Sequence, residues 1–148
     1  MSVALHISFD EYTSMVAAGA FEPLRDRRIE LISGELREMN PPGPTHAEAV
    51  SRIIHWSVLE PPRHSVKVRI QDPIGIPELD SAPQPDIVWA KPGSYTDHHP
   101  EPDEVYLVIE VADSSLDYDL GEKADLYATA GIADYWVVDL RGRVIHIL

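Results

Sequence analysis

The sequence contains no cysteine, and this absence excludes several kinds of chemistry at once. Disulfide frameworks, zinc–thiolate sites and cysteine nucleophiles all require that residue. A signal peptide and a membrane-spanning run are missing as well. The segment Met1–His6 has no positively charged start, and the apolar runs near Val105 and Tyr135 are too short to cross a bilayer. We therefore expect a soluble, cytoplasmic protein.

Basic residues are also scarce: 12 Lys and Arg stand against 25 Asp and Glu, a formal net charge of −13. Proteins that coat nucleic acid need clustered cations, because counterion release from phosphates dominates their binding. A wholly basic protein of that class is excluded, but a locally basic groove is not. Residues 25–69 hold eight basic and six acidic residues, whereas residues 92–140 hold one and twelve. Any nucleic acid that binds would therefore have to approach the earlier half of the chain.

Apolar side chains, by contrast, are plentiful. They make up 44% of the 148 residues, enough for one domain, 1–148, to fold around a single core. Capping residues and helical periodicity predict helices over about residues 8–19, 45–60 (capped by Thr45) and 114–130. Alternation and turn residues predict a hairpin over 29–39 and strands over 66–71, 85–90, 105–112 and 133–140, with a last strand beginning at Arg143.

Two carboxylates are conspicuous because each lies in an otherwise apolar strand. Glu110 is the only charged residue of Val105–Ala112, a run typical of a central strand, and Asp86 begins the strand after Pro85. A buried carboxylate is costly unless a cation or donor faces it. Two carboxylates near the ends of adjacent strands can share Mg²⁺ or Mn²⁺, which prefers oxygen ligands. Alternatively, each one meets solvent or an arginine.

A single lysine provides a candidate cation for these carboxylates. Lys123 is the only basic residue between Lys91 and Arg141, a stretch that holds twelve acidic residues. At about 100° per residue, helical phase places Lys123 on the apolar face of its helix, aimed at the sheet that carries Glu110. The alternative is an ion pair with Asp119 one turn earlier, worth only a few tenths of a kcal/mol.

Two further polar residues are candidates for the same region. His46 shares the inner face of its expected helix with Val50 and Ile53, so its side chain should point inward. A catalytic role for it competes with that of a satisfied core or capping histidine. Glu30 of the hairpin either points into this region or remains exposed to solvent.

Short motifs in a fixed order run through nearly the whole chain. They are Ile29–Glu35, the helix opening at His46, Gln84–Asp86, Val108–Val111, Asp119–Lys123, Tyr127 and Gly131–Asp139. No single motif is very specific, but the ordered set resembles the Uma-two family of bacterial "putative restriction endonucleases". This resemblance implies the PD-(D/E)XK nuclease superfamily. The implied fold is α/β (α+β), a restriction-endonuclease-like core in which helices flank a mixed β-sheet.

The resemblance also implies a metal site. Asp86 resembles the superfamily's first metal-binding aspartate, and Glu110 resembles the acidic residue of its second motif. Ala112 stands where that motif ordinarily has a lysine, and Lys123 of the following helix matches the residue that replaces it. Asp86, Glu110 and the carbonyl of Val111 would hold Mg²⁺ or Mn²⁺ for phosphodiester hydrolysis.

The remaining candidates receive supporting roles from the same resemblance. Lys123 is expected to position or help deprotonate the attacking water and to offset charge on the transition-state oxygens. His46 is expected to orient water or contact the phosphate. Glu30 is expected to bind a second ion or to fix Lys123.

Three functions remain open from the sequence. The first is a metal-dependent DNA endonuclease, acting as a homodimer because two strands must be cut. The second is an inactive interaction module that keeps the nuclease fold, and the third is a metal hydrolase of another phosphate or small ester. A shared metal site requires that the functional groups of Asp86, Glu110 and Lys123 converge within about 4–6 Å.

Overall fold

Four α-helices and seven strands form the computed structural model, which describes all 148 residues. The helices are α1 (Phe9–Ala17), α2 (Pro44–Leu59), α3 (Leu116–Leu120) and α4 (Glu122–Ala130). The strands are β1 (Arg28–Ile32), β2 (Glu35–Met39), β3 (Lys67–Ile70), β4 (Ile87–Ala90), β5 (Val105–Ala112), β6 (Tyr135–Asp139) and β7 (Val144–Ile147). Every strand predicted from the sequence is present.

The main sheet is mixed, as the family resemblance implies. Its strand order is β3-β4-β5-β6-β7, in which only β5 and β6 run parallel. β5 occupies the centre, and all its side chains except Tyr106 are buried. The apolar run therefore correctly predicted a central strand covered on both faces.

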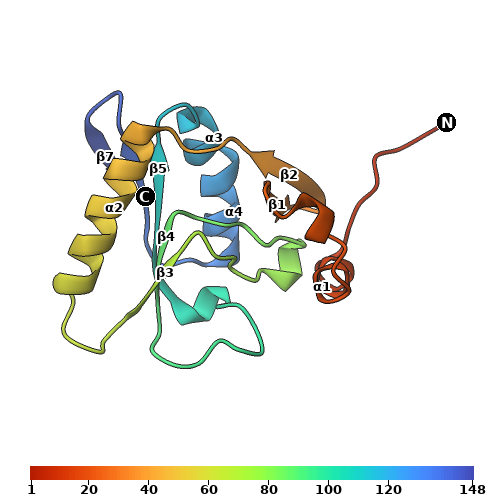
Figure 1. The fold of residues 1–148 in the computed structure, drawn as a ribbon, viewed down its shortest axis with the longest axis horizontal. Helices are drawn as coiled ribbons and strands as arrows, with labels where there is room; N and C mark the ends of the chain where they lie inside the picture. Colours follow the sequence, from red (N-terminus) through yellow and green to blue (C-terminus); the bar gives the residue numbers. More distant parts are fainter.

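Helices cover both faces of this sheet (Figure 1). α2 packs on one face, where Val50 meets Ile109 and Val111, and α4 packs on the other, where Leu126 joins the core of Val108 and Ala112. Side chains alternate between the two faces of a strand. Glu110 lies between Val108 and Ala112 in this alternation, so its side chain faces the α4 layer.

The hairpin β1–β2 forms a separate two-stranded sheet beside the main one. Its turn residues Ser33 and Gly34 have φ values of 48° and 82°, which a tight two-residue hairpin turn requires. A bridge between Leu31 and Ala82 ties β1 to the segment that leads into β4. The side chain of Glu30 points to the opposite face from that of Leu31 and is thereby held toward the main sheet.

Two details of the predicted helices are wrong. The expected helix over 114–130 is two helices, α3 and α4, because the chain breaks at Gly121, where an added Cβ would lie 2.7 Å from the carbonyl oxygen of Asp117. Thr45 does not cap α2. Gly43 is the N-cap and Pro44 the first helical residue, a position that suits proline because no backbone N–H is needed there.

The computed structure contains no helix that is both long and apolar enough to span a membrane.

Candidate active site

Strand pairing brings Asp86 and Glu110 together. β4 and β5 are antiparallel, with Ile87 opposite Ile109. Asp86, the residue just before β4, therefore lies beside Glu110, which follows Ile109 in β5. The backbone N–H of Asp86 donates to Glu110 Oε1 at 3.0 Å, and the N–H of Val111 donates to Asp86 Oδ2 at 2.8 Å. Both carboxylates are 5% exposed. They therefore form one buried acidic pair rather than two solvent-facing strand ends.

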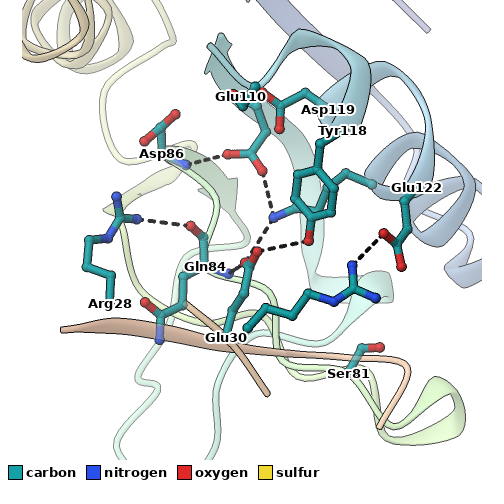
Figure 2. Close-up of polar contacts among 12 residues, drawn as sticks. Arg28, Glu30, Ser81, Gln84, Asp86, Glu110, Tyr118, Asp119 and Glu122 are labelled. Carbon is teal, nitrogen blue, oxygen red and sulfur yellow. Dashed lines mark hydrogen bonds and ion pairs between the residues drawn. The ribbon is translucent and has the colours of Figure 1, made fainter. Parts of the chain in front are cut away.

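Lys123 approaches this pair from α4. Its Nζ lies 2.8 Å from Glu110 Oε2 and 3.0 Å from Glu30 Oε2, and the side chain is 1% exposed. Figure 2 shows these two contacts as dashed lines that meet at a single nitrogen. The lysine points inward as helical phase predicted, although the helix assumed for that argument is broken. Asp119 accepts a hydrogen bond from Ser115 instead of pairing with Lys123.

Glu30 is buried, and the alternative of an exposed hairpin carboxylate is wrong. It is 1% exposed and accepts three hydrogen bonds, from Lys123 Nζ at 3.0 Å, Tyr118 Oη at 3.1 Å and the backbone N–H of Gln84 at 3.0 Å. The hairpin, the segment before β4 and the helices α3 and α4 therefore all meet at this carboxylate.

His46 lies at the first turn of α2 with its ring toward Asp86. Nε2 is 3.2 Å from Asp86 Oδ2, whereas Nδ1 is buried and has no hydrogen-bond partner. The hydrogen bond to Asp86 raises the pKa of His46, and burial partly opposes that shift. One buried ring nitrogen of His46 therefore has no hydrogen-bond partner, and the other is held by Asp86.

Burial controls the ionisation of the carboxylates. It raises the pKa of Glu110 from 4.5 to about 8 and that of Asp119 from 3.8 to about 6, although the charge of Lys123 opposes both shifts. Burial by itself lowers the pKa of Lys123. Electrostatic interactions with Glu110, Tyr127 and Glu30, together with the hydrogen bond to Glu110, outweigh this and raise the lysine pKa well above 10.5.

These side chains line one cavity of about 430 Å³. Several residues of its lining were not predicted from the sequence: Arg28, Arg37, Tyr118 and Asp119. Asp119 was detectable, because the helical phase that turns Lys123 inward turns the residue one helical turn earlier inward too. Arg28 and Arg37 carried no such signal, since only the docking of the hairpin against the main sheet brings them to the cavity.

The cavity has more buried negative than positive charge. Glu30, Asp86, Glu110 and Asp119 are each at most 5% exposed, and Lys123 is the only buried ammonium facing them. No three acidic or histidine side chains lie close enough to hold an ion by themselves. Mg²⁺ does not need three, because it is commonly bound by one or two carboxylates, water and substrate phosphate. Asp86 lines the cavity with Oδ1 free of protein donors, so the donor set fits a hard divalent cation.

A solved structure shares the fold of this chain. A crystal structure at 1.96 Å resolution, described as "a putative nuclease belonging to DUF820 from Anabaena variabilis ATCC 29413", superposes with a TM-score of 0.71 at 16% sequence identity. The match covers 96% of this chain and 79% of the other. No curated protein matches this chain in sequence. The mixed sheet with its flanking helices thus has the fold of a protein described as a nuclease.

Residues 10–148 match the model of a protein family described as "Uma2: Putative restriction endonuclease". The chain belongs to this family, and the family resemblance seen in its motifs is confirmed. The description of the family supports a nuclease function in general terms.

Proposed function

We propose that this protein is a metal-dependent DNA endonuclease that hydrolyses phosphodiester bonds. The observation that carries the proposal is the position of Lys123, a fully buried ammonium that contacts Glu110 beside Asp86 in an open cavity. A buried cation clamped between carboxylates is costly to maintain, since desolvation offsets much of the attraction. A merely structural core would be as stable with apolar residues there, whereas hydrolysis of a phosphate diester needs this charge.

Asp86 and Glu110 would hold Mg²⁺ or Mn²⁺, together with the carbonyl oxygen of Val111. Such an ion lowers the pKa of a bound water and polarises the phosphate. The protein fixes the spacing of the two carboxylates, because each accepts a backbone N–H, Glu110 from Asp86 just before β4 and Asp86 from Val111 in β5.

Lys123 and His46 would act on the reacting groups directly. The ammonium of Lys123 donates hydrogen bonds to the attacking water and offsets the negative charge that develops on the phosphate oxygens. His46, held by Asp86 through Nε2, orients that water or contacts the phosphate. The arginines Arg28 and Arg37 line the same cavity and provide positive charge for the DNA backbone.

The test of this proposal is cleavage of circular DNA, both supercoiled plasmid and single-stranded circles, by protein purified to constant specific activity. We expect cleavage with millimolar Mg²⁺ or Mn²⁺, none with chelator, and calorimetric binding of the same ions to the DNA-free protein. Ion binding without cleavage of either DNA would favour a hydrolase of another phosphate ester. Absence of both would favour an inactive interaction module and overturn the proposal.

Glu30 is a positioning residue in this proposal, because it acts through Lys123. Glu30→Gln is expected to reduce kcat about 10- to 100-fold with little change in KM. The charge of Glu30 also raises the pKa of Glu110, so its removal should move the acid limb of the pH–rate profile to lower pH. Measured pH–rate profiles of both proteins check this result.

Glu48→Gln is the matched control for that variant, since Glu48 is exposed on α2 and pairs with Arg52. It should leave both rate and profile unchanged. A purely structural role for Glu30 would lower the amount of active protein and leave the acid limb of the remaining activity where it is in the wild type.

A further inference from the structure

A second cavity, of about 580 Å³, adjoins the first. The two cavities share Arg28 and Gln84 in their linings, so they adjoin at the start of β1. α1 and the turn that follows it form the wall of the second cavity. None of the roles proposed above for the catalytic residues uses this space.

Aromatic rings and arginines dominate the chemistry of this second cavity. Both phenylalanines of the chain, Phe9 and Phe21, line it together with Tyr12, and the rings of Tyr12 and Phe21 pack at 5.6 Å. Three arginines line it against one acidic residue, Glu22, in a chain whose acidic residues outnumber its basic ones by two to one. Such a combination binds an anion that carries a flat apolar group.

Arg28 stands at the junction and has no acidic partner. Arg27 is neutralised by two hydrogen bonds to Glu38, and Arg25 lies 3.5 Å from Glu22. The guanidinium of Arg28 donates only to the carbonyl oxygen of Gln84, at 3.4 Å, as Figure 2 shows. A half-buried guanidinium with most of its donors free is suited to a phosphate, which it can bind through two parallel hydrogen bonds.

We propose that the second cavity binds the nucleotide next to the scissile phosphate, with Arg28 on its phosphate and its unpaired base against Phe9, Tyr12 and Phe21. This inference rests on the proposed nuclease function and specifies its substrate as single-stranded DNA or an unpaired stretch. The cavity volume lies within the range of about 300–1,000 Å³ that accommodates small ligands. A base that remains paired in a duplex cannot reach rings inside a cavity.

Fluorescence anisotropy with a labelled single-stranded oligonucleotide and its duplex, in chelator so that no cleavage occurs, tests the proposal. We expect the single strand to bind more tightly than the duplex. Arg28→Gln and Phe21→Leu should each weaken single-strand binding by about tenfold, the latter because stacking is lost while the apolar contacts of the wall are kept. Duplex binding should change little in Phe21→Leu.

Arg52→Gln is the matched control, because Arg52 is exposed on α2 with Glu48 and lines neither cavity. If Arg28→Gln and Arg52→Gln weaken binding equally, or if the duplex binds as tightly as the single strand, the proposal is overturned. Circular dichroism of each variant identifies a loss of folding, and a photo-crosslink then locates the base without any substitution.

The crosslink uses the wild-type protein and an oligonucleotide that contains 4-thiothymidine. We expect mass spectrometry to find the adduct on Phe9, Tyr12 or Phe21. Adducts confined to other elements overturn the proposal.

Cleavage that is insensitive to Arg28→Gln and Phe21→Leu would disprove the binding site in the second cavity but not the nuclease activity. The expected binding and crosslinks without any cleavage under Mg²⁺ would disprove the nuclease activity but leave the binding site standing.

Discussion

Replacement of Lys123 by methionine is expected to lower DNA cleavage about 10²- to 10³-fold, because the charge that faces the developing oxyanion is removed. The same change should reduce the free energy of unfolding by about 3–5 kcal/mol, since Glu30 and Glu110 would lose the cation that both contact in the core. Methionine fills nearly the same volume, so the loss reports on charge rather than on a cavity. Cleavage rates and urea unfolding measure the two effects.

The stability loss should depend on pH. Glu110 has a pKa of about 8 in the folded protein, above its ordinary value of 4.5. Its contribution to the free energy of unfolding is therefore complete below about pH 4.5 and is lost as the pH rises toward about 8. Without Lys123 the folded pKa of Glu110 rises further, and the loss continues to higher pH. In metal-free buffer, the difference from wild type should therefore be larger at about pH 9 than at about pH 6.

Lys91→Met serves as the control, because Lys91 is exposed and lies outside the active-site cavity. It should change neither cleavage nor unfolding appreciably. A Lys123→Met protein that unfolds like the wild type at both pH values would show that Lys123 is not the cation that stabilises this carboxylate cluster. Cleavage at the wild-type rate would remove Lys123 from the mechanism.

Asp86→Asn is expected to reduce cleavage on the order of 10³-fold, because several kcal/mol of metal-assisted stabilisation are lost with the ligand. The fold should persist. An asparagine oxygen can still accept the N–H of Val111, so the free energy of unfolding should change by only about 1 kcal/mol. Cleavage assays, calorimetric Mg²⁺ titration and urea unfolding of the same preparation separate these effects.

Asp125→Asn is the matched control for Asp86→Asn, since Asp125 is exposed on α4 and lines neither cavity. We expect wild-type cleavage and ion binding from it. Equal cleavage by all three proteins would mean that Asp86 holds no catalytic metal. If Asp86→Asn loses cleavage but binds Mg²⁺ as the wild type does, Asp86 is not a ligand of the ion.

Local patterns were sufficient to predict the elements of this fold. The apolar run of β5, the capping box at Ser8 and Glu11, and the turn at Ser33–Gly34 each specify their structure through nearest neighbours along the chain. The break at Gly121 was missed because the helical pattern continues through it. Only the close approach of the Asp117 carbonyl shows why the residue there is glycine.

The sequence by itself placed Glu110 and Asp86 in apolar strands and predicted that Lys123 points inward, because strand runs and helical phase are local properties. Whether the two carboxylates face solvent or the interior remained open. Tertiary structure decided what these groups meet. Glu30 lies 93 residues from Lys123 in the chain, and it reaches the lysine only because the hairpin docks against the main sheet. The same docking brings Arg28 to the junction of the two cavities. Contacts between distant segments depend on how whole elements pack, and no local pattern encodes that packing.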